Sequence, residues 1–386
     1  MYPDKELNIM GLNIEGSDSE IDKDEDSSAG SVITQPFSPS DIKISNPPMN
    51  MGDLIDMIQY GWVDFEADYQ REDNLWDEGK QSRLIESALL GLRLPAFYFE
   101  EVSKKKWRII DGLQRCSSIR NFCVDKTLKL KELEFLDFDG VGFDRFDFEL
   151  RRDLRMLPIT VNLLEPGVPD EVKYILFKRL NTGGVNLMPQ EIRNSMFRGR
   201  AIDMVKRLAA CDEFRQATEN KVPSRRKQDQ DFVSRFMSFY LIGYESYEPD
   251  LEAFINSAMT AVNNGVYSQE TLERMYDDFV AAMCMARNIF GGDAFRKISD
   301  HKRGPINKAL FEVVSVTFAR LSLEQRARLE TDCASSLRET LKAEFDSNPR
   351  FTYALSTTTG RADNVRTRFN TFESMVKKLL DNDQDS

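Results

Sequence analysis

The fold of the first half of the chain is decided by the stretch Trp107-Arg108-Ile109-Ile110-Asp111-Gly112-Leu113-Gln114-Arg115. Trp107 to Ile110 is typical of a strand that stops at Asp111-Gly112, and a helix follows to about Cys123. A helix that begins where a strand ends directs its first N–H groups into a shared opening, where they can bind an anion. Asp111 is expected to cap this helix, and Gly112 lets the backbone approach a ligand closely.

Arg115 is expected in the first turn of that helix, where the helix dipole disfavours a positive charge by about 0.3–1 kcal/mol. A bound anion would remove this cost, and phosphate is the obvious anion because arginine can bind it with two hydrogen bonds. The alternative is an ordinary strand-to-helix turn in which Arg115 pairs with a neighbouring acidic residue. The pattern leaves both interpretations open.

The segments around this stretch alternate between helix-like and strand-like patterns. A helix is expected from about Asp77 to Leu90, with Gly91 at its C-terminal end. Strands are expected from Ala96 to Glu100 and from Pro158 to Leu164. These elements predict a small mixed α/β domain.

Three further motifs contribute polar side chains. Tyr69-Gln70-Arg71 ends a strand-like segment and supplies an aromatic ring, an amide and a guanidinium. Arg83 lies on the expected outer face of the helix, where it can equally form a surface pair with Glu86. Asn181-Thr182-Gly183-Gly184 separates two expected helices, and Arg193 is expected in the first turn of the second, against its dipole.

From Glu191 to about Leu380 the pattern is helical, without a fixed-period repeat. The fold class is therefore α+β. We expect the following parts: a disordered acidic tail over residues 1–48, the mixed α/β domain over 49–190, an α-helical domain over 191–375 and an acidic tail over 376–386.

The formal net charge of −12 argues at first against a phosphate-bearing ligand. Most of this charge lies at the ends, because residues 1–31 contain nine acidic residues and two lysines, and residues 381–386 contain three aspartates. The body is nearly neutral, so the charge does not exclude a polyanion. The N-terminal segment is expected to aid solubility; alternatively, it imitates a polyanion and competes for a basic groove. Basic residues cluster at two places, for which a solvated face is the simpler interpretation: Arg193, Arg198, Arg200, Lys206 and Arg207, and Lys221, Arg225, Arg226 and Lys227.

The histidine and cysteine content excludes several classes of site. The only histidine is His301, so no HEXXH motif and no zinc centre with two histidines can form. The five cysteines contain no CxxC pair, which argues against a disulfide framework or a zinc site, and we expect no metal site made by the protein alone. The sequence shows neither a signal peptide nor a membrane-length apolar run, so a cytoplasmic protein without a membrane partner is expected.

Several motifs together resemble the N-terminal domain of GmrSD-type restriction enzymes, a family of bacterial and phage proteins with a ParB/sulfiredoxin-like fold. The order and spacing agree over about 130 residues, in the following segments: Asp68 to Arg71, Trp76, Arg83 to Ser87, Leu94-Pro95, Ile110 to Arg115, Leu180 to Gly184 and Gln190 to Asn194.

The resemblance implies that a nucleoside triphosphate is bound and hydrolysed. Mg²⁺ is expected as its companion ion, with Asp111 as a candidate ligand if its carboxylate is not fully used as a cap. It implies catalytic, phosphate-gripping roles for Asp111, Gln114 and Arg115. It places further residues in the nucleotide or phosphate site: Tyr69, Gln70, Arg71, Arg83 and Gly112, with Asn181, Thr182, Gly183 and Arg193 on the opposite wall. Leu113 replaces the first glutamine of the family's Asp-Gly-Gln-Gln-Arg loop, which bears on hydrolysis more than on binding.

The expected function is that of a nucleotide-binding regulatory or sensor protein of a phage-defence or restriction system. A separate nuclease subunit would supply any His-Asn-His cleavage, since this chain has one histidine. The alternative is a ParB-like DNA-binding module without nucleotide chemistry, whose affinity would fall steeply with salt. A third option is an antitoxin-like interaction protein. The sequence leaves the oligomeric state open.

Overall fold

A computed structural model describes residues 21, 43–65, 76–180, 188–298 and 303–382. The chain divides into two compact units, each described by itself. The α/β unit contains residues 31–203 and 255–266, and the helical unit contains residues 1–30, 204–254 and 267–386.

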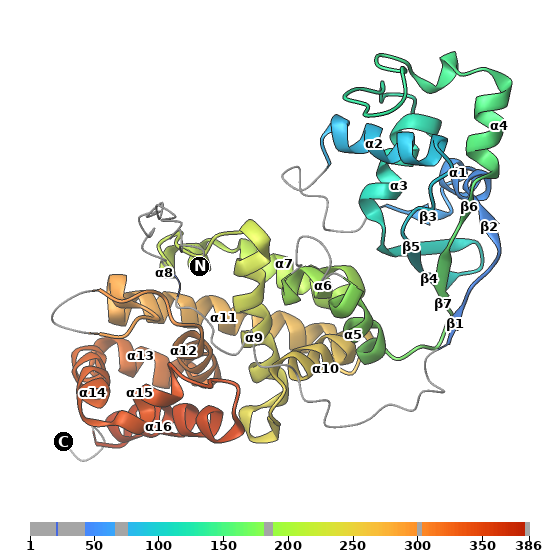
Figure 1. Ribbon diagram of the computed structural model, residues 1–386. Helices are drawn as coiled ribbons and strands as arrows, with labels where there is room; N and C mark the ends of the chain where they lie inside the picture. Colours follow the sequence, from blue (N-terminus) through green and yellow to red (C-terminus); the bar gives the residue numbers. More distant parts are fainter. Residues whose placement is uncertain (1–20, 22–42, 66–75, 181–187, 299–302, 383–386) are drawn as a thin grey trace, which may run out of the picture. The chain divides into compact units, whose positions relative to one another are not determined.

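A five-stranded mixed sheet forms the centre of the α/β unit (Figure 1). Its strands, in spatial order, are β1 (Ile44–Ser45), β7 (Val161–Leu164), β4 (Phe97–Ser103), β5 (Lys106–Asp111) and β3 (Val63–Asp64). β4 and β5 form an antiparallel hairpin, whereas β3 runs parallel to β5 and β7 runs parallel to β4. A second sheet pairs β2 (Met49–Asn50) with β6 (Pro158–Ile159).

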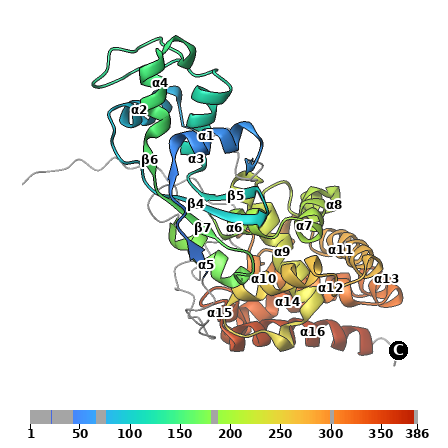
Figure 2. The ribbon, with the colours of Figure 1, turned by 90° about the vertical axis from the view of Figure 1, so that its right-hand side faces the viewer.

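Helices cover both faces of the five-stranded sheet (Figures 1 and 2). The helices of this unit are α1 (Met51–Gln59), α2 (Glu78–Leu89), α3 (Leu113–Ile119), α4 (Phe148–Met156), α5 (Asp170–Leu180) and α6 (Pro189–Met196). Side chains alternate along β4, so Phe97 and Phe99 are buried in the main core with residues of α1, α2 and α3. On the other face, Ile110 and Leu164 pack with residues of α5 and α6. The fold therefore is the mixed α/β arrangement expected.

The pattern around the central stretch predicted most of these elements. α2 occupies the helix expected over 77–90, and Asp77 caps it by accepting a hydrogen bond from the Lys80 N–H at 2.7 Å. The single strand expected over 158–164 is wrong in detail. It is two short strands, because β6 pairs with β2 while β7 pairs with β4.

The helical unit follows as expected and contains no named strand among its described residues. Its helices are α8 (Asp212–Ala217), α9 (Gln228–Ile242), α11 (Gln269–Phe290), α12 (Lys308–Arg320), α13 (Leu323–Thr331), α14 (Ala334–Ser347), α15 (Pro349–Ala354) and α16 (Ala362–Asn382). Two more helices, α7 (Arg200–Ala210) and α10 (Leu251–Asn263), contribute residues to both units. Short 3₁₀ turns span Phe143–Arg145, Arg225–Lys227, Tyr244–Ser246 and Gly291–Asp293, and a π-helical turn spans Arg120–Val124.

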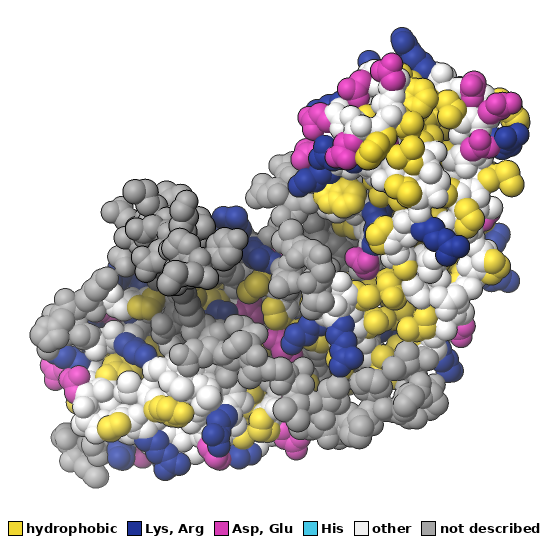
Figure 3. Space-filling view, viewed as in Figure 1, with side chains coloured by type: hydrophobic (Ala, Val, Ile, Leu, Met, Phe, Trp, Pro, Cys, Tyr) yellow, Lys and Arg dark blue, Asp and Glu magenta, His cyan; other side chains and the backbone are white. Residues whose placement is uncertain are grey.

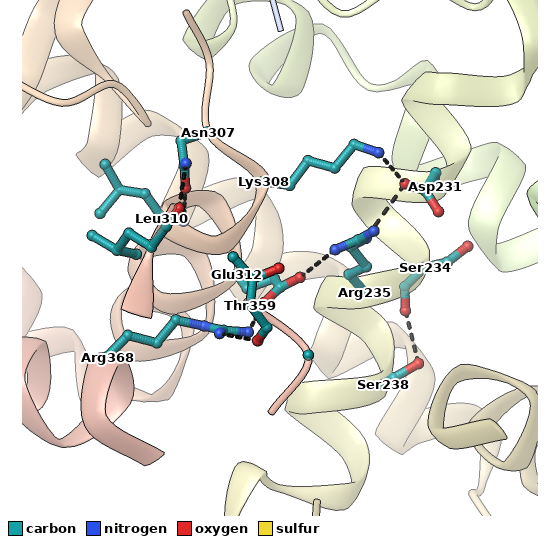
Figure 4. Close-up of polar contacts among 12 residues, drawn as sticks. Asp231, Ser234, Arg235, Ser238, Asn307, Lys308, Leu310, Glu312, Thr359 and Arg368 are labelled. Atoms are coloured by element: carbon teal, nitrogen blue, oxygen red, sulfur yellow. Dashed lines mark hydrogen bonds and ion pairs between the residues drawn. The ribbon is translucent and has the colours of Figure 1, made fainter. Parts of the chain in front are cut away.

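A chain of buried charges joins three helices inside the helical unit (Figure 4). Glu312 of α12 is fully buried and accepts hydrogen bonds from Arg235 of α9 at 2.9 Å and from Arg368 of α16 at 2.6 Å. Asp231 pairs with Arg235 and with Lys308, the latter at 2.9 Å. Because both arginines are also buried, the carboxylate of Glu312 compensates charges that water cannot reach.

The boundaries of the expected tails differ from those of the structure. Strand β1 at Ile44–Ser45 pairs with β7, so sheet structure begins within the segment expected to be a tail. Ile21 forms an isolated bridge with Ile306 of the helical unit. At the other end, α16 continues to Asn382, because its apolar residues Val376 and Leu380 are buried.

Candidate functional site

The site predicted from sequence lies where β5 passes into α3. β3 and β5 are parallel, with Asp64 opposite Arg108, so the carboxyl ends of both strands point toward one edge of the sheet. β5 ends at Asp111 on this edge and α3 begins at Leu113. The segment that follows β3 in the sequence contains Tyr69-Gln70-Arg71 and lies outside the described residues.

Gly112 is the N-cap of α3 and adopts a left-handed conformation with φ of 103°. A Cβ atom at this position would lie 2.9 Å from Cδ1 of Phe97 and 3.2 Å from Nη2 of Arg115. Glycine is therefore required by the packing of the protein itself, in addition to its backbone angles. The expectation that Asp111 caps the helix is wrong: Asp111 is the last residue of β5, and no side-chain hydrogen bond from a described residue caps α3.

Arg115 folds back from α3 over the start of β4. Its Nη2 donates to Oδ2 of Asp111 at 2.6 Å and its Nη1 donates to the Ala96 carbonyl at 3.2 Å. Its guanidinium lies 5.0 Å from the centre of the Phe97 ring, which adds a cation–π contact. The residue is 8% exposed. The ion pair with a neighbouring acidic residue, one of the two interpretations of the sequence, is thus present, and it balances the positive charge in the first turn.

Gln114 connects α3 to the start of α2. Its Oε1 accepts a hydrogen bond from the backbone N–H of Trp76 at 2.9 Å. Trp76 immediately precedes Asp77, the N-cap of α2. The amide of Gln114 therefore fixes the point at which the chain enters α2, beside the predicted site.

Arg83 and Glu86 do not form the surface pair that their spacing on α2 allows. Arg83 lies 3.6 Å from Glu132, and both of these side chains are well exposed. Glu86 is 3% exposed and accepts hydrogen bonds from the backbone N–H groups of residues 134, 135 and 136. Burial acts to raise the pKa of Glu86, but these three N–H groups, helped by Arg83, hold the pKa below its usual value. The sequence placed Glu86 on the outer face; the loop after Leu130 covers it.

Arg193 lies on α6 but not in its first turn. The helix begins at Pro189, and Glu191 caps it by accepting the Met188 N–H at 2.7 Å. Arg193 is therefore near the C-terminal end, where the helix dipole favours a positive charge, and the expected opposition to the dipole is wrong. Its side chain is fully buried and donates to Asn256 and to Gln190, each at 3.1 Å.

The remaining predicted residues are not described. Asn181, Thr182 and Gly183 fall in the segment between α5 and α6, and His301 falls in another gap. The described residues thus bring together Asp111, Gly112 and Arg115.

Charged residues on the second face of the sheet escaped the sequence analysis. Glu100 of β4 pairs with Lys173 at 2.7 Å and with Arg108 at 3.3 Å. Asp64 of β3 pairs with Arg198 at 2.9 Å. The only sequence signal for these pairs is the placement of charged residues within the strands. The sequence favoured a solvated basic face for Arg198. Its side chain instead pairs with Asp64 of the sheet.

The described residues contain no group of three or more His, Cys, Asp or Glu side chains that could hold a metal ion. Among the described residues, Asp111 supplies a carboxylate at the β5–α3 junction, and its side chain is 32% exposed. Protein-bound Mg²⁺ commonly takes one or two carboxylates and completes its shell with phosphate oxygens and water. Asp111 therefore fits a Mg²⁺ ion that arrives with a nucleotide.

These features define a mixed α/β domain with an Asp-Gly strand-to-helix junction backed by an arginine. Residues 51–198 match the family described as GmrSD restriction endonuclease, N-terminal domain, so this part of the chain is similar to that family. The family indicates that the protein takes part in a restriction or phage-defence system. No curated protein and no solved structure matches the chain. None of the helices in the described ranges is both long enough and apolar enough to cross a membrane.

Proposed function

We propose that the α/β unit binds a nucleoside triphosphate at the β5–α3 junction and acts as a regulatory or sensor component of the restriction system. The observation that carries this proposal is the first turn of α3, which begins at Gly112 without a capping side chain among the described residues. The N–H groups of such a turn point away from the helix and attract an anion.

The residues around this turn suit a phosphate group. Arg115 uses Nη2 toward Asp111 and Nη1 toward the Ala96 carbonyl, and a guanidinium has five N–H donors in total. It can therefore supply positive charge next to the turn while Phe97 and Asp111 keep it in place. We assign to Arg115 the role of stabilising the negative charge of a phosphate group that is bound at the first turn of α3.

Asp111 has a second role in this proposal. Its Oδ2 receives the hydrogen bond from Arg115, and the partly exposed carboxylate has a second oxygen for an ion that accompanies the nucleotide. Bound Mg²⁺ would neutralise charge on the phosphates. Gln114 holds Trp76 and so acts as a positioning residue. Whether the bound nucleotide is hydrolysed is a separate question, because Leu113 stands in place of the family's first glutamine.

Isothermal titration calorimetry of the full chain with ATP and with GTP, each with Mg²⁺, tests the binding proposal. Arg115→Gln should weaken binding about ten-fold or more, in keeping with the loss of one charge-assisted contact. Arg274→Gln is a matched control, since Arg274 also pairs with an acidic residue four positions away, Glu270, but on an exposed helix surface. Folded protein that binds neither nucleotide would contradict the proposal. Release of inorganic phosphate tests hydrolysis independently.

DNA binding by the same junction is the alternative function. Duplex DNA would then bind with an affinity that falls steeply with salt, whereas the nucleotides would not bind. The described contacts make the alternative less favourable, because Arg198 and Arg207 of the first basic cluster are paired with Asp64 and Glu273. In either case, we propose that any His-Asn-His cleavage is supplied by a separate nuclease subunit.

A further inference from the structure

The tip of the β4–β5 hairpin carries three consecutive lysines. Lys104 and Lys105 form the turn, and Lys106 begins β5. All three are exposed, and no described acidic residue forms an ion pair with them, including Glu101, the nearest one in the sequence. Basic side chains also lie among hydrophobic ones on the face of the α/β unit that Figure 3 shows. Three unpaired positive charges within one turn attract a polyanion.

The backbone of this turn is unusual for a lysine. Lys105 has a φ of 68°, in the left-handed region. Two-residue hairpin turns normally have glycine, asparagine or aspartate at a position with positive φ, because the Cβ of other residues is disfavoured there. The hairpin thus keeps a cation at its tip where a glycine would relieve the backbone strain. Strain that a smaller residue would remove points to a role for the side chain that causes it.

Two aromatic rings lie beside the turn. Trp62 immediately precedes β3, and its carbonyl accepts a hydrogen bond from the Trp107 N–H of β5 at 2.8 Å. Nζ of Lys105 lies 5.2 Å from the centre of the Trp62 ring. The ring of Tyr60 lies 5.6 Å from that of Trp62, and Tyr60 is 68% exposed. We call these two aromatic residues and the three lysines at positions 104–106 the hairpin-tip patch.

The aromatic rings decide which polyanion the hairpin-tip patch fits. Unpaired bases of a single strand stack on exposed aromatic side chains. The carboxylates of an acidic polypeptide cannot do so, and the bases of a duplex already stack on one another. The contact between Lys105 and Trp62 is at the surface, where a cation–π contact is weak. Lys105 can therefore move to a phosphate and leave the ring of Trp62 to a base.

We propose that the hairpin-tip patch binds a single-stranded nucleic acid, with its three lysines contacting backbone phosphates and its two aromatic rings stacking on bases. The patch lies at the start of β5, whereas Asp111 ends this strand about 17 Å away. The patch is therefore separate from the β5–α3 junction, and this inference does not depend on nucleotide binding there.

Fluorescence anisotropy of labelled oligo(dT) and oligo(U), each of about 12 nucleotides, tests the proposal with the full chain and without nucleoside triphosphate. The logarithm of the binding constant should fall with the logarithm of the salt concentration with a slope of about −2, since each of three phosphate contacts contributes about −0.7. Lys104→Gln with Lys106→Gln should weaken binding at least about ten-fold and reduce the slope to about −0.7. The matched control is Lys377→Gln with Lys378→Gln, which removes two exposed lysines from α16 and should have no effect.

Two single variants separate stacking and charge from a structural role. Tyr60→Ala should weaken binding at least about five-fold and leave the salt slope unchanged, because it removes a stacking ring but no charge. Lys105→Gly relieves the left-handed backbone, so thermal unfolding followed by circular dichroism should show no loss of stability. The same variant should still weaken binding several-fold, because it removes a phosphate contact.

Four results would overturn the proposal. The first is that neither strand binds at about 50 mM salt, where phosphate contacts are strong. The second is binding that is unchanged both by Lys104→Gln with Lys106→Gln and by Tyr60→Ala. The third is a duplex of the same length that binds as tightly as the single strand, since stacking then contributes nothing. The fourth is poly-L-glutamate that displaces the oligonucleotide as well as unlabelled oligonucleotide does, since the partner is then an acidic polypeptide.

Discussion

Nη2 of Arg115 donates a hydrogen bond to Oδ2 of Asp111 at 2.6 Å, joining the last residue of β5 to the first turn of α3. The pair spans the glycine at which the chain changes from strand to helix. Arg115 is almost fully buried, whereas the carboxylate is one-third exposed, so the arginine depends on the aspartate more than the aspartate depends on the arginine. This asymmetry makes the junction sensitive to loss of the acid.

Asp111→Ala should lower the free energy of unfolding by about 2 kcal/mol, because it leaves a buried guanidinium without its carboxylate. Adding Arg115→Met should recover more than half of this loss, since the apolar side chain still packs on Phe97. Urea unfolding followed by tryptophan fluorescence measures both variants, and circular dichroism, which also reports on the helical unit, measures the comparison variant. The exposed pair of Glu270 and Arg274 provides the comparison, and Glu270→Ala should change stability by less than about 0.5 kcal/mol. Equal effects of Asp111→Ala and Glu270→Ala would contradict this account.

Glu86 should make the α/β unit less stable in acid. Its pKa is lowered in the folded protein, so its contribution is present above the usual glutamate pKa of about 4.3 and disappears as the pH falls through the lowered value. Glu86→Gln should therefore lower the free energy of unfolding at pH 7. The difference in this free energy between the variant and wild type should become progressively smaller below about pH 4. Glu132→Gln is the control, because Glu132 is exposed and contacts Arg83 only loosely. A constant difference between Glu86→Gln and wild type at all pH values would exclude this mechanism.

The local pattern predicted those elements whose signals lie close together in the sequence. α2 has a capping aspartate and a buried stripe with helical spacing, and β5 ends at the Asp-Gly pair that also begins α3. The division of residues 158–164 into two strands could not be predicted. It depends on pairing with β2 and β4, which lie far away in the sequence.

The sequence singled out the residues of the β5–α3 junction, but it did not predict their contacts. The sequence indicated that Asp111 and Arg115 are close, since they are four positions apart near a helix start. It could not indicate that Arg115 lies over Phe97, because that contact depends on the register between β4 and β5. Likewise, Glu86 has the spacing of a surface residue, and only a loop some 50 residues later buries it.

Gly112→Ala should cost about 2–3 kcal/mol of unfolding free energy. The added Cβ meets the Phe97 ring at 2.9 Å, and alanine must also adopt a φ of 103°. Gly140→Ala separates the two effects, because Gly140 has a φ of 79° and nothing lies within 4 Å of its added Cβ. That variant should lose only about 1 kcal/mol, the backbone cost alone. Chemical denaturation monitored by tryptophan fluorescence measures the free energy of unfolding of both variants. A similar loss of this free energy in Gly112→Ala and Gly140→Ala would show that the contact with Phe97 is unimportant.

Glu312 should be the most sensitive acidic residue of the helical unit. Glu312→Ala leaves the buried Arg368 without a carboxylate and removes one of two acidic partners from Arg235, so we expect a loss of about 3–5 kcal/mol. Combining Glu312→Leu with Arg368→Met removes both charges of the inner pair, and Arg235 keeps Asp231. This double variant should recover most of the stability, because replacing a buried ion pair with apolar side chains is often close to neutral. Guanidinium unfolding followed by circular dichroism measures the effect, since all three tryptophans, Trp62, Trp76 and Trp107, belong to the α/β unit. A double variant that is less stable than Glu312→Ala would show that Arg368 has a stabilising role beyond its pair with Glu312, through the Thr359 carbonyl to which it donates at 2.6 Å.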